Sequence, residues 1–200
     1  MTRKIFVLGF LFALTSCTQM YTNVPPGGMH QPGSYLASLG AGGASPGGDS
    51  VSYWDGDGVQ GPPSVTIDLG DQRAYFYKGG KLVGVSKISS GTPINPTPTG
   101  SFKVSQKNEN HRSNLYGEIV DAAGNVINKE ADSRVDKVPP GGRFVGAKMP
   151  FFMRFNGGVG MHAGYLPGFP ASHGCVRMPD RMAKIFFYNV SHGTPVTVVP

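Results

Sequence analysis

The sequence has only two cysteines, Cys17 and Cys175, and one tryptophan among its 200 residues. It has no dense run of lysine and arginine and no RNA-reading motif, although its formal net charge is +6. This absence argues against a role in nucleic-acid binding, and a mildly basic surface suits anionic envelope material instead. Paired C-x-x-C or H-x-x-x-H spacing is also missing, which argues against a structural zinc site.

Aliphatic residues are scarce from Tyr21 to Pro63, where glycine and proline are abundant. Such a segment cannot bury enough apolar surface to offset the entropy that it loses on ordering. We therefore expect a flexible tether over residues 17–63 and a folded domain over residues 64–200, which is long enough for a single core. Within the tether, Trp54 is the best candidate for a side chain that docks on the domain.

The N-terminus, MTRKIFVLGFLFALTSC, combines basic residues, a short apolar run and small residues. This pattern is typical of a secretory leader, and the apolar run is too short for a membrane-spanning helix. The ending LTSC resembles the bacterial lipobox, in which the cysteine is lipidated and becomes the mature N-terminus. We expect a signal peptide over residues 1–16 and a periplasm-facing protein that a lipid on Cys17 anchors, in the outer membrane if the cell is Gram-negative. The alternative is an ordinary leader with an incidental cysteine.

The second cysteine lies in the stretch ASHGCVRMP at residues 171–179. If Cys17 is acylated, Cys175 has no partner for an intramolecular disulfide. A thiol needs a nearby base or cation to form the reactive thiolate, and His162 and His173 are the candidates. In an extended segment, His173 and Cys175 project to the same side. A buried inert thiol and a metal site that uses these three side chains are the alternatives.

Short apolar stretches separated by turn signals predict a mainly β domain. A hairpin is expected around Gly79-Gly80, between one strand over 65–77 and another over 81–89. Residues 180–189 predict the one helix, because they follow a proline and place apolar residues on one face. Other expected features are strands at 101–105, 149–155, 159–162 and in the terminal TPVTVV, and a turn at 123–125 within a polar insertion at 108–136.

Four motifs, GMHAG, ASHGCVRMP, TPTGSFKV and GTPVTVV, together resemble the L,D-transpeptidase catalytic domain, or YkuD domain, over residues 64–200. The family signature is a histidine, a loop and Ser/Thr-His-Gly-Cys, followed by an aliphatic residue and Arg or Asn. The resemblance implies a β-sandwich or barrel-like domain with one short helix after the catalytic loop, and no cofactor or metal. Nine residues separate His162 from Ser172, fewer than the family usually has, which bears on substrate fit.

The resemblance also assigns roles at the expected active site. Cys175 is the nucleophile, and His162 is the base that the backbone carbonyl of Ala163 orients. His173 shapes the same pocket as a further catalytic residue. The amides of His173, Gly174 and Cys175 form the oxyanion hole, for which a glycine in the turn is suited.

Other polar side chains have two readings each. Arg177 is placed to bind a substrate carboxylate or to hold the loop by a salt bridge. Ser172 supports either the substrate or the loop, and Tyr116 either lines the substrate groove or packs. His111 is either an exposed loop histidine or part of the pocket wall. The TPTG run at 97–100 is expected to be a structural turn that borders the groove.

The function that the resemblance implies is peptidoglycan biosynthesis, and with it cell-wall biogenesis and cell shape. Cys175 would form a thioester acyl-enzyme with a stem tetrapeptide. It would then pass the acyl group to an amine of another stem peptide or of an envelope lipoprotein. The alternatives are an L,D-carboxypeptidase or other hydrolase with the same acyl-enzyme, and a non-catalytic wall-binding lipoprotein.

Overall fold

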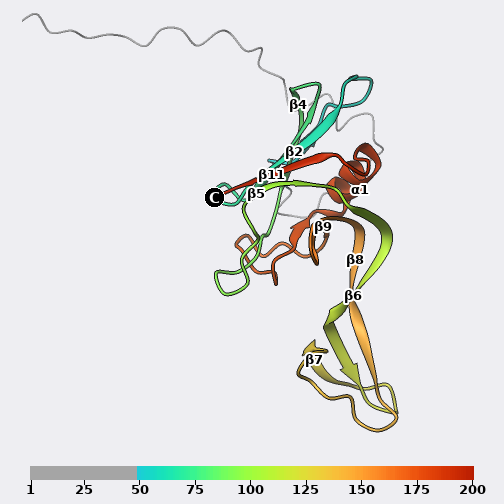
Figure 1. Ribbon diagram of the computed structural model, residues 1–200. Helices are drawn as coiled ribbons and strands as arrows, with labels where there is room; N and C mark the ends of the chain where they lie inside the picture. The colour runs from blue at the N-terminus through green and yellow to red at the C-terminus, as the bar shows by residue number, and fades with distance from the viewer. Residues whose placement is uncertain (1–48) are drawn as a thin grey trace, which may run out of the picture. The chain divides into compact units, whose positions relative to one another are not determined.

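Two β-sheets and one helix build residues 49–200, the part of the chain that the computed structural model describes (Figure 1). The expected leader, the lipidation site and most of the expected tether lie outside these residues. The prediction of a mainly β domain with one helix is confirmed. No helix among the described residues is both long enough and apolar enough to span a membrane.

The first sheet has six strands, and an antiparallel meander forms its centre. Its order is β1 (Tyr53–Trp54), β4 (Lys81–Lys87), β3 (Arg73–Lys78), β2 (Pro63–Asp68), β11 (Pro195–Val199) and β5 (Gly100–Lys103). The stretch 65–77 is two strands, not the one expected, because a tight turn with a left-handed Gln72 (φ 51°) divides it. The turn at Gly79-Gly80 is confirmed, and both glycines have positive φ values of 59° and 80°.

The core lies where the first sheet, the second sheet and helix α1 (Asp180–Asn189) meet, and the helix buries Met182 and Phe186 in it. Trp54 is 3% exposed and packs its indole edge-on against Phe76, with 5.1 Å between ring centroids. Residues 49–63, which the sequence assigned to the tether, therefore belong to the compact unit, and β1 pairs with β4. The buried aromatic ring outweighs the Gly-rich composition around it.

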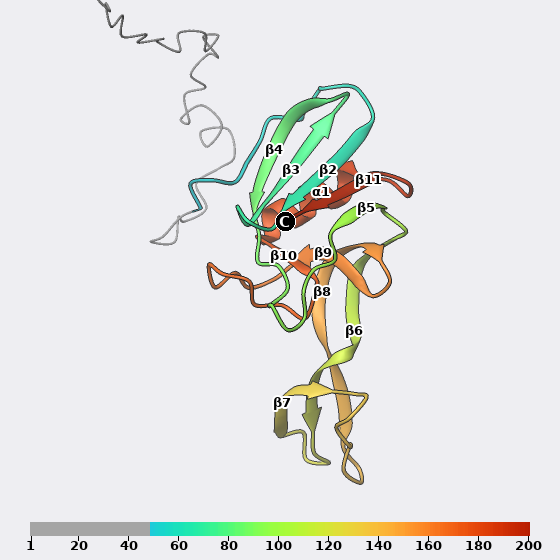
Figure 2. The same ribbon diagram turned by 60° about the vertical axis from the view of Figure 1, so that its left-hand side comes forward.

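The second sheet carries a long projection. Its order is β10 (Val176–Met178), β9 (Val159–Ala163), β8 (Arg143–Asn156), β6 (Gln106–Val120) and β7 (Val126–Asp132). Strands β6 and β8 pair along their length and run away from the helix, with β7 at the far end (Figure 2). We call residues 109–148 the arm. The arm contains most of the expected polar insertion, and the expected turn at 123–125 joins β6 to β7.

Strands β9 and β10 bring the motifs GMHAG and ASHGCVRMP together. They pair in parallel, so that Arg177 lies opposite His162. On the other side, isolated bridges join Ser89 to Arg177 and Gly91 to Ser172. The stretch ASHGCVRMP is therefore held between β9 and the loop that follows β4.

Candidate active site

One pocket of about 480 Å³ contains both Cys175 and His162 on its lining. The pocket gathers strands from the second sheet and the loop before β10. Every side chain that the sequence analysis placed at the expected catalytic site lines it: Cys175, His162, His173, Ser172, Tyr116 and Arg177. Tertiary structure thus unites segments that lie up to 61 positions apart, from Tyr116 to Arg177.

His162 lies on β9, where it is 6% exposed. Its Nδ1 donates a hydrogen bond to the carbonyl oxygen of Ala163 at 2.8 Å, which leaves Nε2 as the acceptor of the neutral ring. The pKa of His162 is lowered to about 4. Burial is the main cause, the bond to Ala163 opposes the shift, and the nearby Arg177 and His111 add to it. The imidazole is therefore neutral at neutral pH and can accept a proton.

Cys175 lies just before β10, half-buried, with its Sγ 3.8 Å from the carbonyl oxygen of Gly158. Burial raises the pKa of its thiol, while a hydrogen bond from the Gly160 amide and the charges of Arg154 and Arg177 act in the opposite direction. A raised thiol pKa and a lowered imidazole pKa favour a neutral pair in the resting protein. Proton transfer from the thiol would then accompany its attack on a substrate.

The hydroxyl group of Ser172 stabilises the turn before Cys175. Ser172 is 3% exposed, and its Oγ donates to the carbonyl oxygen of Cys175 and accepts from the amide of Gly174 at 3.1 Å. Gly174 has a φ of 108°, a conformation that side-chain-bearing residues rarely adopt. Ser172 thus supports the loop. The Gly174 amide, one of the three expected oxyanion donors, already has an acceptor within the turn.

Arg154 is a pocket residue that the sequence analysis missed. Its guanidinium donates to the side chain of Gln106 at 2.7 Å and to the carbonyl oxygen of Gly157 at 2.6 Å. It also lies over the ring of Phe152, which stacks on His111 with 4.2 Å between centroids. His111 is therefore part of the pocket wall. The available signal was a single arginine within the apolar run MPFFMRFN.

Tyr116 connects the arm to the catalytic loop. Its ring stacks on His173, with 4.3 Å between centroids and 20° between planes. Arg134 donates to the Tyr116 hydroxyl at 2.9 Å and pairs with Asp132, whose pKa it lowers to about 2. Tyr116 therefore lines the groove and packs at the same time, so both readings of the sequence describe it.

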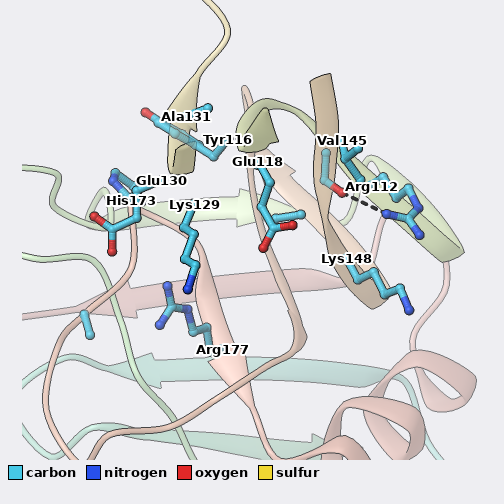
Figure 3. A pocket seen from close by; sticks show the side chains of 14 residues that line it. Arg112, Tyr116, Glu118, Lys129, Glu130, Ala131, Val145, Lys148, His173 and Arg177 are labelled. Atoms are coloured by element: carbon cyan, nitrogen blue, oxygen red, sulfur yellow. Dashed lines mark hydrogen bonds between the residues drawn. The ribbon is translucent and has the colours of Figure 1, made fainter. Parts of the chain in front are cut away.

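A second hollow of about 730 Å³ adjoins the first (Figure 3). Its walls come from the arm and the catalytic loop, and it shares Tyr116, His173 and Arg177 with the cysteine pocket. Lys129 of β7 and Arg177 point toward one another within it. Neither forms a salt bridge with a residue in 49–200. The two hollows make a continuous groove from Cys175 to the arm, with unpaired cations along it.

No group of three or more His, Cys, Asp or Glu side chains within the described residues could hold a metal ion. The cysteine pocket presents a thiol and an imidazole on its lining. Residues 62–198 match the family model of the L,D-transpeptidase catalytic domain, YkuD. The chain belongs to this family.

Solved L,D-transpeptidases share the fold. The catalytic domain from Enterococcus faecium, solved by NMR, is 28% identical with a TM-score of 0.50, over 71% of this chain and 100% of that one. A cysteine-to-serine mutant of the Enterococcus faecium L,D-transpeptidase is 27% identical, with a TM-score of 0.50, over 70% of this chain and 50% of that one. An L,D-transpeptidase from Mycobacterium smegmatis is 21% identical, with a TM-score of 0.52, over 69% of this chain and 58% of that one.

This last similarity shows the fold alone. The chain spans about half the length of the first L,D-transpeptidase structures that it matches. No curated protein matches the sequence.

Proposed function

We propose that this protein is a peptidoglycan L,D-transpeptidase that forms a thioester on Cys175. The observation that supports the proposal most strongly is the single pocket that contains this thiol and the buried, neutral His162. A neutral imidazole is the form that removes a proton from a thiol. Membership of the L,D-transpeptidase family supplies the substrate class, a stem peptide of the cell wall.

In the first step, the Cys175 thiol gives its proton to His162 as Sγ attacks the carbonyl carbon between the L-centre and the D-residue. The new C–S bond forms a tetrahedral oxyanion, which backbone amides at the turn stabilise. The intermediate collapses by breaking the C–N bond. The leaving amine of the terminal D-amino acid takes the proton back from the imidazolium, and a thioester remains on Cys175.

In the second step, an amine attacks the thioester carbon and gives its proton to His162. A C–N bond forms, the C–S bond breaks, and the thiolate recovers the proton. The acceptor would be a diamino-acid side chain of another stem peptide or a lysine of an envelope lipoprotein. Water in place of the amine would make the protein a hydrolase with the same acyl-enzyme.

The groove next to the thiol suits a peptide that carries a carboxylate. Arg177 and Lys129 point toward one another there, and each offers N–H donors to an anion. Tyr116, stacked on His173, adds an aromatic surface to the lining of both hollows. We propose that these three side chains bind the stem peptide.

The N-terminal segment would place the enzyme at its substrate. We propose that a lipid on Cys17 anchors the protein to a membrane and that the Gly/Pro-rich segment gives the domain reach toward the wall. Metabolic labelling with a fatty acid tests this anchor. Cys17→Ala should abolish incorporation, and Cys175→Ala is the matched control that should leave it intact.

The experiment that tests the proposed function is incubation of the purified domain with muropeptides, followed by mass spectrometry. Wild type should form crosslinked or exchanged products, and Cys175→Ala should form none. Products from the alanine variant would show that Cys175 is not the nucleophile. A parallel time course with and without an added amine separates transfer from hydrolysis, since only transfer depends on the amine.

A further inference from the structure

The TPTG run contributes a buried hydroxyl to the turn before Cys175. Thr97 is 2% exposed, and its Oγ1 lies 2.8 Å from the carbonyl oxygen of Gly174, which is 77 positions away. The same Oγ1 lies 2.9 Å from the amide nitrogen of Gly91. A backbone amide only donates, so the one hydroxyl proton must go to Gly174. The direction of both hydrogen bonds is therefore determined.

This contact orients the amide of Cys175. The Gly174 carbonyl and the Cys175 N–H belong to one planar peptide unit, and residues 49–200 contain no cis peptide bond. In a trans unit, the C=O and the N–H point in opposite directions. A hydrogen bond that fixes the Gly174 carbonyl on one side therefore fixes the Cys175 N–H on the other.

Within residues 49–200, Thr97 is the donor to the Gly174 carbonyl, whereas Ser172 holds the two neighbouring peptide units through the Gly174 amide and the Cys175 carbonyl. Gly174 has a φ of 108° and no side chain, so its backbone rotates more freely than that of other residues. A Cβ atom placed on it would meet its nearest neighbour, Val159, at an ordinary contact distance of 3.5 Å. A glycine does not by itself fix the peptide unit that follows it, so the hydrogen bond from Thr97 is a directional constraint on the unit between Gly174 and Cys175.

Thr97 is itself held by a rigid loop. Ser89 and Arg177 exchange two backbone hydrogen bonds, at 2.9 and 3.0 Å, and the Thr92 amide donates to the carbonyl of Ser172 at 3.0 Å. A side chain on Gly91 would approach a backbone oxygen of the same loop to 2.2 Å, so this loop has no spare room there. The loop after β4 thus fixes the position of Thr97 relative to the catalytic turn.

We propose that Thr97 is a positioning residue for the oxyanion hole, whose hydroxyl aims the Cys175 amide at the reacting carbonyl. The inference rests on the proposed acyl transfer and adds to it a residue outside the signature around the cysteine. Because the Gly174 amide is occupied by Ser172, the amides of His173 and Cys175 remain as expected donors, and Thr97 sets the direction of the second. Thr97 acts through that amide and does not touch the substrate.

Two reactions of the same thiol test this role. Imipenem acylates a thiol when Sγ bonds to the lactam carbonyl carbon, which gives a tetrahedral oxyanion. The C–N bond of the lactam then breaks, and its nitrogen takes a proton. Iodoacetamide alkylates the thiol by displacement of iodide, with no oxyanion. In Thr97→Val, acylation should slow by about 30- to 100-fold, and alkylation should change by less than about 3-fold. Thr97→Ser keeps the hydroxyl and should restore acylation.

The outcomes separate this inference from the proposed function. Equal slowing of both reactions in Thr97→Val, or unchanged acylation, would overturn the positioning role. If wild type itself is alkylated but never acylated by imipenem or by muropeptides, the proposed function fails and the inference fails with it. If Thr97→Val does not fold, Thr97→Ala leaves space for a water between the two backbone groups. It should show the same selective loss of acylation, about 10-fold.

Discussion

The catalytic loop and the arm line the same groove, but they are held in place in different ways. The loop at residues 171–178 is hydrogen-bonded to distant segments, such as Ser89 through Arg177 and Thr97 through Gly174. The side-chain hydrogen bonds of the arm are mostly local and exposed, as between Asp121 and Asn125. Strand β6 is buried mainly at its last residues, whereas β9 is buried along most of its length.

This difference indicates that the catalytic loop and the arm have different functions. Groups that need accurate placement for proton transfer and oxyanion stabilisation lie where the core holds them. Lys129 and Tyr116, two of the side chains that we propose contact the substrate, lie on the arm, where exposure lowers the energy of each contact. Substitutions in the core should therefore change stability or chemistry, and substitutions in the arm should change substrate affinity.

The largest effect is expected from Trp54, which tests the core. Trp54→Ala removes a ring that contacts Phe76 and whose Nε1 donates to Asp57 at 2.8 Å. The free energy of unfolding should fall by about 3–5 kcal/mol, measured by urea titration. Tyr53→Ala, at a neighbouring residue that is 39% exposed, is the control and should cost less than about 1 kcal/mol.

The KM of folded Trp54→Ala should stay as in wild type, because the ring lies outside the groove. A loss of stability no larger than that of Tyr53→Ala would contradict the assignment of residues 49–63 to the compact unit.

A somewhat smaller effect is expected from protonation of His162, which makes the free energy of unfolding depend on pH. Its pKa of about 4 lies below the ordinary 6.5, so the unfolded chain binds more protons between these values. Stability should therefore be independent of this group above pH 6.5 and fall by about 3 kcal/mol as the pH drops to 4. His162→Gln should remove that slope in urea titrations at successive pH values.

The exposed His192 provides the control, since His192→Gln should leave the slope intact. An unchanged slope in His162→Gln would show that this imidazole is not held neutral by burial.

A change of about 1 kcal/mol in the free energy of substrate binding is expected at Tyr116, where the arm meets the catalytic loop. Tyr116→Ala removes the ring stacked on His173, so KM for a muropeptide should rise by about 3- to 10-fold. Tyr116→Phe keeps the ring and loses only the contact with Arg134, so its KM should stay close to wild type. Thermal unfolding should be similar in all three proteins. A large loss of melting temperature in Tyr116→Ala would place Tyr116 with the core.

The smallest effect is expected from an exposed charge of the arm. Lys129→Met should raise KM about 2- to 5-fold for a stem peptide with a free terminal carboxylate, and less at high salt. The amidated peptide should show no change. Lys137→Met removes an exposed charge elsewhere on the arm and should behave as wild type with both peptides. The same rise for the amidated peptide would exclude carboxylate binding by Lys129.

Local sequence signals predicted the elements that depend on local chemistry. The turn at Gly79-Gly80 and the helix at 180–189 follow from glycine conformation and from apolar periodicity, and both are present. The prediction of one strand over 65–77 was wrong, because the turn at 69–72 divides it; the Gly70-Asp71 pair was the available signal, and the positive φ falls on Gln72, a residue that rarely adopts it. Strand β10 was missed because three residues are too few to show periodicity.

The site likewise has features that the sequence indicated and features that depend on the fold. The sequence marked Cys175 and His162, because a thiol and an imidazole in these motifs are chemically recognisable. It did not show that Gly174 donates to Ser172, since a hydrogen bond within a turn depends on the conformation of the turn. Arg154 was overlooked because an arginine in an apolar strand gives no sign of which pocket it faces.

The sequence by itself determined the family of this protein and the residue types of its chemistry, because motif composition and order are properties of the chain. Tertiary structure decided the electrostatic state and the geometry of the site. Burial makes His162 neutral, and pairing of β9 with β10 places Arg177 beside it. Contact across 77 positions places Thr97 on Gly174. Desolvation and hydrogen-bond direction exist only once distant segments have packed together.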